Sequence, residues 1–163
     1  MRIFAAGALI FWAACAPSIG FQINVHNPDK GFGNIVITQF PEQRQLGRYP
    51  LGIDKTFSLS FIHSVSKTRV TDVYEVRADQ IVQTKEIFKT HGAGLPSNIE
   101  EPGGLFWEKI GDDFILHMER PIPKLVVRTD KAYQNRLISA FGIINLNQWE
   151  DQALLLYVES GKK

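Results

Sequence analysis

An imidazole and a carboxylate on apolar strand faces are the groups in this sequence best suited to acid–base chemistry. His63 lies within residues 57–65 and Asp72 within residues 70–76, and both stretches alternate apolar and polar side chains as half-buried strands do. An unpaired charge on a buried face is costly, so the two groups are expected to be partners. A carboxylate that accepts from one imidazole nitrogen orients the ring for use as a general base or as a metal ligand.

The alternation also predicts how the two strands pair. A turn at residues 66–69 sets Val65 opposite Val70, and this register sets His63 opposite Asp72. The core-facing residues further from the turn pair in the same register, Phe61 with Tyr74 and Leu59 with Val76. A slip of one residue would turn the apolar set of one strand against the polar set of the other. We therefore expect His63 and Asp72 to be direct cross-strand neighbours, with Cβ atoms about 5 Å apart.

The residues next to this pair point the other way. Ser64 and Glu75 occupy the opposite face of their strands, because side chains alternate along a strand. A hydrolytic triad of Ser64, His63 and Asp72 is therefore disfavoured, since a nucleophile and its base must lie within hydrogen-bond reach. Glu75 is expected to form a surface ion pair with a nearby cation: Lys67, Arg69 or Arg77. The residue types favour a structural His63–Asp72 pair over a site, and both interpretations stay open.

A glycine-rich turn, residues 91–96, follows the next predicted strand. Gly92 and Gly94 permit positive φ and close backbone approach, and successive N–H groups in such a turn can form a nest for an anion. No Lys-Ser/Thr pair follows, as it would in a phosphate-binding loop, so a tight crossover is the favoured interpretation. His91 could join His63 in a site or cap the turn. The candidate site residues are His63, Ser64, Asp72, Tyr74, Glu75, His91, Gly92, Gly94 and Pro96.

Metal binding is the next chemistry to consider. None of the four histidines, His26, His63, His91 and His117, sits at a recognised ligand spacing from another, and there is no pair of cysteines. A zinc site would need three or four ligands gathered from separate strands, of which His63, Asp72 and His91 could supply three. We predict no metal, no cofactor and no assigned catalytic residue.

The elements that must position these residues are short strands separated by turns. No stretch keeps a helical period over three turns, and the strands recur about every 8 to 12 residues. We predict an all-β, antiparallel single domain, either a sandwich or an open barrel of roughly 8–10 strands. The predicted strands cover residues 21–25, 34–40, 57–65, 70–76, 80–88, 105–110, 114–118, 125–128, 137–141 and 154–158. Helical turns are expected at residues 133–136 and 149–152.

The start of the chain has the pattern of an export signal. Arg2 is followed by an uncharged apolar run over residues 3–14, which is short for a bilayer span of about 20 residues. We expect a signal peptide over residues 1–16 and a single β domain over residues 21–163. Cys15, the one cysteine, ends a segment that resembles a bacterial lipobox, with Trp12 where that pattern prefers Leu. Lipidation of Cys15 and removal with the signal are both open, and a periplasmic or exported location is expected.

The chain resembles the bacterial domain-of-unknown-function family 1850. Three groups of residues carry the resemblance: residues 61–65 (FIHSV), residues 67–76 with Lys67, Thr68 and Val70, and residues 92–96 (GAGLP). A looser likeness extends over residues 46–158. Ser66 departs from the acidic residue expected after His-Ser-Val, and Asp72 departs from the expected Glu. The resemblance implies a small exported protein that is often encoded next to the membrane subunit of tripartite (TRAP) transporters of the TAXI type.

Three functions are compatible with these patterns. The favoured one is a non-enzymatic accessory or binding protein that contacts a transporter membrane subunit or its solute-binding receptor. The alternatives are a carrier of a small ligand and a hydrolase or metal-dependent enzyme using His63, Asp72 and His91. The near balance of 18 basic and 17 acidic residues argues against a nucleic-acid partner. A membrane contact is expected only through a lipid anchor on Cys15.

Overall fold

The computed structural model describes residues 32–89 and 101–161, and all structural statements below refer to these residues. Several predictions fall outside them: the export signal with Cys15, the strand at residues 21–25, and the turn that contains His91, Gly92, Gly94 and Pro96. No helix in residues 32–89 and 101–161 has the length and apolar character needed to cross a lipid bilayer.

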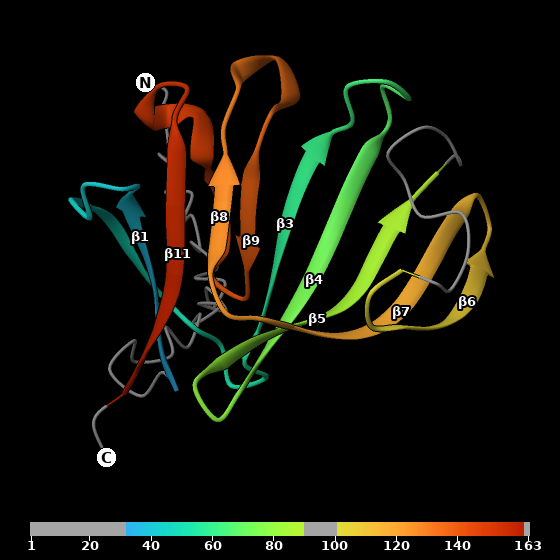
Figure 1. The fold of residues 1–163 in the computed structure, drawn as a ribbon, viewed down its shortest axis with the longest axis horizontal. Helices are drawn as coiled ribbons and strands as arrows, with labels where there is room; N and C mark the ends of the chain where they lie inside the picture. The colour runs from blue at the N-terminus through green and yellow to red at the C-terminus, as the bar shows by residue number, and fades with distance from the viewer. Residues whose placement is uncertain (1–31, 90–100, 162–163) are drawn as a thin grey trace, which may run out of the picture.

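Two antiparallel sheets form one domain, and this confirms the predicted all-β sandwich (Figure 1). The smaller sheet has the order β2 (Gln45–Pro50), β1 (Gly33–Gln39), β11 (Ala153–Ser160), β8 (Leu125–Arg128). The larger sheet has the order β10 (Gly142–Asn145), β9 (Arg136–Ser139), β3 (Thr56–Ile62), β4 (Arg69–Arg77), β5 (Gln80–Phe88), β7 (Asp113–Ile122), β6 (Gly104–Ile110).

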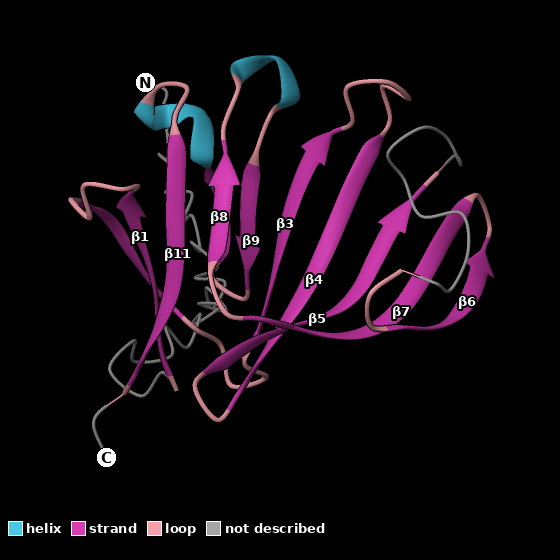
Figure 2. Cartoon of the chain, viewed as in Figure 1, coloured by secondary structure: helices cyan, strands magenta, loops and turns pink. Residues whose placement is uncertain are grey.

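Helical structure in the described part of the chain is limited to two short 3-10 turns (Figure 2). η2 (Lys131–Tyr133) links β8 to β9 and begins at Asp130, whose carboxylate accepts from the backbone N–H of Ala132 at 2.8 Å. η3 (Leu146–Trp149) begins at Asn145, which caps it in the same way. Each turn starts two or three residues earlier than predicted, because a capping side chain sets its first residue.

The main core lies between the two sheets. Ile35 and Ile37 of β1 and Leu154 and Leu156 of β11 pack against the inner faces of β3 and β4 and are at most 1% exposed. Each fully buried aliphatic side chain of this kind stabilises the fold by about 1.5–3 kcal/mol. A second, smaller cluster lies further along the larger sheet and consists of Val70 and Phe88 with Phe61, Trp107 and Phe114 packed against them.

The boundaries of the strands agree closely with the alternation in the sequence, with two omissions. β5 and β8 begin and end at the predicted residues, and the predicted hairpin at Gly111 joins β6 to β7. β2 and β10 were not predicted. β2 lies at a sheet edge with no fully buried side chain, and three of the four residues of β10 are exposed, so neither strand has a strong apolar alternation.

The pairing of β3 with β4 corrects the predicted register. The structure pairs Leu59 with Asp72, Phe57 with Tyr74, and Phe61 with Val70. The predicted partners, His63 with Asp72 and Val65 with Val70, are therefore wrong, as are Phe61 with Tyr74 and Leu59 with Val76. The predicted register is displaced by an even number of residues, so the side chains predicted to face the core do lie on the inner face. The turn that joins β3 to β4 is longer than predicted. β3 ends at Ile62, and His63 belongs to the turn.

Candidate functional site

His63 holds the turn between β3 and β4 instead of facing Asp72. Its Nδ1 accepts from the backbone N–H of Ser66 at 3.2 Å and of Val65 at 3.4 Å, and the Ser66 hydroxyl lies 3.2 Å from the same nitrogen. Its own backbone N–H donates to the carbonyl of Thr68 at 2.9 Å. Because Nδ1 accepts these bonds, the proton of the neutral ring is on Nε2. The imidazole therefore acts as a local acceptor that shapes a loop.

Two further predicted site residues are separated from Asp72. Ser64 is exposed in the turn. Glu75 faces away from Asp72, as predicted, and its Oε2 pairs with Arg77 at 2.8 Å. That bond, with the charge of Arg77, lowers the pKa of the Glu75 carboxyl. Tyr74 is different, because it is 4% exposed on the inner face and its ring stacks on Phe57 with 5.1 Å between centroids.

Asp72 belongs to a row of polar side chains on the inner face of the larger sheet, which we call the polar row: Asp72, Gln83, Glu86 and Arg120. Gln83 donates from Nε2 to Asp72 Oδ1 at 3.0 Å, and its Oε1 accepts from Arg120 Nε, also at 3.0 Å. The hydroxyl of Tyr74 donates to Asp72 Oδ2 at 3.4 Å. Gln83 is 1% exposed, so its amide is a fully buried bridge between a carboxylate and a guanidinium.

Glu86 completes the polar row from the next strand. It lies directly opposite Asp72 in the pairing of β4 with β5, which brings two carboxyl groups to neighbouring positions. Burial, opposed by Arg120 and the Tyr74 hydrogen bond, raises the pKa of Asp72 to about 6. Burial and the charge of Asp72, opposed by Arg120, raise the pKa of Glu86 to about 7. Neighbouring carboxyl groups whose pKa values are raised this far are a common mark of a functional site, and also of a buried polar network.

The sequence did not predict three members of the polar row: Gln83, Glu86 and Arg120. For Arg120, the alternation of side chains along its strand does indicate an inward direction. Arg120 shares the strand parity of the apolar residues Phe114, Leu116 and Met118, so it points inward with them. Glu86 carried no such signal. A β-bulge between Gln83 and Lys85 changes the parity of β5, and an uninterrupted period of two places Gln83 and Glu86 on opposite faces.

The structure places the predicted site residues in two neighbouring pockets. Asp72 and Tyr74 line a pocket of about 170 Å³ between β3, β4 and β8. His63 and Ser64 line a second pocket of about 300 Å³ next to Arg128 and Tyr133. Phe61, Val127 and Asn135 border both pockets. His63 and Asp72 thus line separate pockets and share no hydrogen bond. No group of three metal-ligating side chains occurs within residues 32–89 and 101–161.

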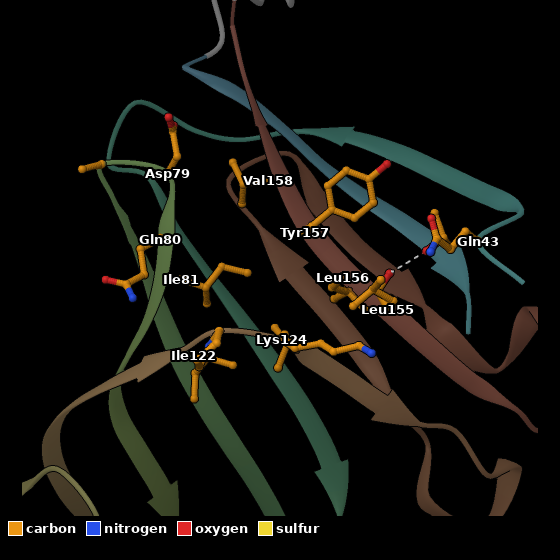
Figure 3. A pocket seen from close by; sticks show the side chains of 14 residues that line it. Gln43, Asp79, Gln80, Ile81, Ile122, Lys124, Leu155, Leu156, Tyr157 and Val158 are labelled. Atoms are coloured by element: carbon orange, nitrogen blue, oxygen red, sulfur yellow. Dashed lines mark hydrogen bonds between the residues drawn. The ribbon is translucent and has the colours of Figure 1, made fainter. Parts of the chain in front are cut away.

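A larger pocket of about 620 Å³ opens where the two sheets separate (Figure 3). Its walls come from β11, from the β4–β5 turn and from the crossover between β7 and β8. Apolar side chains such as Ile81, Ile122 and Leu156 alternate with the polar side chains of Gln43, Asp79 and Lys124. Lys124 is held in place by Phe40, whose ring centroid is 4.0 Å from the ammonium nitrogen.

One wall of this open pocket is a free strand edge. β8 pairs with β11 only over Ala153 to Leu156, whereas β11 continues to Ser160. Among the described strands, none pairs with the β8 side of Tyr157 to Ser160. The Ser160 hydroxyl is tied to the carboxylate of Asp79 across the pocket. Among the described strands, this part of β11 therefore presents an edge of the kind to which an extended segment can add.

Comparison with known families identifies the chain. The family described as "Domain of unknown function (DUF1850)" matches residues 57–146, more than half of the sequence. The chain belongs to this family. No curated protein and no solved structure matches it.

The DUF1850 match has a clear structural extent. It begins in β3 and ends at the first residue of η3, so it contains β4 to β10 entirely. The polar row and the turn at His63 lie inside the match. β1, β2 and β11 lie outside it, and they form three of the four strands of the smaller sheet. The open pocket therefore lies where the DUF1850 region meets strands contributed by the rest of the chain.

Proposed function

We propose that this DUF1850 protein is a non-enzymatic binding protein, exported from the cytoplasm, that serves as an accessory to a TRAP solute transporter of the TAXI type. The observation that carries the binding role is the open pocket with the free edge of β11 as one wall. The transporter assignment and the location rest on the resemblance between this chain and its family, and on the pattern of the first residues. The partner is the transporter membrane subunit or its solute-binding receptor.

The chemistry of the open pocket suits recognition of an extended polypeptide. An added strand would bond to the free backbone of Tyr157 to Ser160, and the apolar floor at Ile81 and Ile122 would take alternate side chains. Asp79 and Lys124 at the rim offer one charge of each sign. The pocket lining includes one hydroxyl of the kind that can act as a nucleophile on an aliphatic side chain, that of Thr38, and it donates to the carbonyl of Leu155 at 3.4 Å. The lining contains no histidine that could act as a base for this hydroxyl.

Site-specific cross-linking in the native host tests the proposal. Tyr157 is replaced by a photo-reactive benzoylphenylalanine in the full chain, and Ile143, which is 64% exposed on β10, is replaced in a matched control. We expect a light-dependent adduct with a transporter subunit from position 157 and none from position 143. An adduct confined to the chain itself, or equal adducts from both positions, would overturn the proposal.

A charge reversal gives an independent measurement. Lys124→Glu should reduce co-purification of the transporter subunit and uptake of its solute by about tenfold, because a rim charge is inverted. Lys109→Glu is the matched control, since Lys109 also lies over an aromatic ring, that of Phe114, but at the far edge of the larger sheet. Deletion of the gene without any change in uptake would argue against the transporter role.

An enzyme is the second candidate, and the observation that favours it is the opposed pair Asp72 and Glu86. A carboxyl pair with raised pKa values can supply a general acid and a general base. The pair predicted from the sequence, His63 with Asp72, cannot supply this acid–base chemistry, because the observed register separates the two residues. Hydrolysis of a chromogenic ester, phosphoester or glycoside by wild type, abolished in folded Glu86→Gln, would replace the binding proposal with an enzymatic one.

A further inference from the structure

Two arginines on the outer face of the larger sheet share a single neutral acceptor. Arg69 Nη2 donates to Gln134 Oε1 at 3.1 Å, and Arg136 Nη2 reaches the same oxygen at 3.4 Å. Two guanidinium groups are thereby held side by side. Two like charges that contact the same oxygen repel each other, and a bound anion would offset this unfavourable electrostatic energy.

The fold builds this arrangement from three neighbouring strands. Arg69 is the first residue of β4 and pairs with Ile62, whereas Arg136 is the first residue of β9 and pairs with Ser60. Both arginines flank β3 on the face opposite Leu59 and the core. Arg69 is also anchored from below, because its Nη1 donates to the buried hydroxyl of Ser60 at 2.9 Å.

The position of Gln134 is set by the turn that follows η2. Its backbone is left-handed, with φ of 48°, and closes the turn onto the carbonyl of Lys131. The side chain is thereby brought over the two arginines. Gln134 is exposed, so its amide orders the pair without covering it.

No carboxylate among residues 32–89 and 101–161 forms an ion pair with Arg69 or Arg136. Burial lowers the pKa of Arg69, and the nearby charge of Arg136 lowers it further. Two acidic groups at the neighbouring η2 turn, Asp130 and Asp151, are engaged with the backbone N–H groups of Ala132 and Lys131 at 2.8 and 2.9 Å. The pair is therefore a concentration of positive charge without a counter-charge.

A pocket of about 450 Å³ opens beside Arg136 and is lined by Lys131, Gln134, Arg136, Asn145 and Asn147. We propose that this pocket, together with Arg69, which shares the Gln134 oxygen with Arg136, is a binding site for an oxyanion, a carboxylate or phosphate group carried by a small solute. A guanidinium fork matches the geometry of both groups, and Lys131 adds a third cation at the rim. The site shares no lining residue with the open pocket at β11.

The deciding variant is Gln134→Glu, which puts a carboxylate of nearly identical shape on the oxygen that both arginines contact. Such a group satisfies the arginines internally, so the site should lose its affinity for external anions while the fold is kept. Gln39→Glu is the matched control, since Gln39 Oε1 accepts from one arginine only, Arg44, at 3.1 and 2.9 Å. That change adds the same charge away from the proposed site.

The melting temperature of the full chain is measured in phosphate, in acetate and in chloride at equal ionic strength. Wild type and Gln39→Glu should rise by about 5 °C in either oxyanion at twenty times its Kd, relative to chloride. Gln134→Glu should show no such rise. A response to phosphate alone assigns a phosphate group, and a response to acetate alone assigns a carboxylate.

Nitrogen-15 spectra of the arginine Nε–H groups locate the effect. Phosphate or acetate should shift the Arg69 and Arg136 signals in wild type and leave Arg44 unchanged. Equal melting temperatures in all three salts would overturn the proposal, as would an unaltered response in Gln134→Glu. Neither result depends on a transporter partner, so this inference and the proposed function fail separately.

Discussion

Asp72 on β4 lies directly opposite Glu86 on β5, on the inner face of the larger sheet. The two carboxyl groups share one environment with Gln83 and Arg120, and Arg120 is the cation that opposes the effect of burial on both. One positive charge faces two groups that can each become negative. The protonation of this pair should therefore be visible in the stability of the whole domain.

We expect the polar row to make the free energy of unfolding fall as pH rises towards neutrality. The pKa of Asp72 is raised from 3.8 to about 6 and that of Glu86 from 4.5 to about 7, so the folded state binds protons more tightly than the unfolded chain. Their contribution is fully present below about pH 4 and is lost as pH rises through 6 to 7. For Asp72 it amounts to about 2 to 3 kcal/mol.

Urea titrations of wild type and Asp72→Asn at pH 4.5 and pH 8 measure this effect. The difference in unfolding free energy between the two proteins should change by about 2 kcal/mol over the interval, in favour of the variant at pH 8. Asp112→Asn, at an exposed turn position, is the control and should show no such change. A difference that stays constant between the two pH values would contradict the prediction.

Removal of the Tyr74 hydroxyl should raise the pKa of Asp72 above about 6. That hydroxyl donates to Asp72 Oδ2 at 3.4 Å and so favours the ionised carboxylate. Tyr74→Phe keeps the stacking on Phe57, and the loss of stability should stay below about 1.5 kcal/mol. Carbon-13 titration of the Asp72 carboxyl measures the shift. Tyr157→Phe serves as control, and a lower pKa in Tyr74→Phe would show that the hydrogen bond is not formed.

Replacement of the Gln83 bridge should be among the most costly polar substitutions in the described chain. Gln83→Leu leaves Asp72 Oδ1 and the Arg120 guanidinium without their shared partner in a buried place, at a cost of about 2 to 4 kcal/mol. Gln80→Leu, exposed on the same strand, should change stability by less than about 0.5 kcal/mol. Denaturant unfolding at pH 7 compares them, and similar costs for both would exclude a structural role for the bridge.

His63 and Asp72 should contribute independently to stability. His63 binds its own turn, and Asp72 binds Gln83 and Tyr74, so no hydrogen bond connects them. In a double-mutant cycle of His63→Ala and Asp72→Ala, the coupling energy should be below about 0.5 kcal/mol. Asp72→Ala combined with Gln83→Ala provides the positive control, with a coupling above about 1 kcal/mol. Strong coupling between His63 and Asp72 would restore the direct pair that the register removes.

The sequence predicted the inner face of the hairpin and not its register. Alternation specifies parity, because an odd slip would expose Leu59 and Phe61, whereas an even slip keeps them inside. The length of the turn decided between even registers. His63 ends β3 early by accepting backbone hydrogen bonds at Nδ1, and the pattern of apolar residues contains no information about that preference.

The candidate site also contains some residues that strand alternation predicts and others that only the tertiary structure brings together. Asp72 and Tyr74 were predicted because polar groups stand out on an apolar strand, and Arg120 shares this signal. Glu86 was hidden by the bulge in β5, which is a feature of how three strands fit together. The pairing of Arg69 with Arg136 through Gln134 joins residues from β4, β9 and a turn, and no spacing in the sequence brings them together.

By itself, the sequence determined the all-β class, the strand faces and the family, because these depend on local alternation and on short motifs that each strand carries alone. The tertiary structure alone decided which polar groups meet, and it decided that His63 shapes a turn while Asp72 faces Glu86. It also left one side of Tyr157 to Ser160 in β11 without a partner among the described strands, beside an open pocket. Contacts between distant strands depend on turn lengths, bulges and the order of strands in a sheet, and these are set by packing of the whole domain.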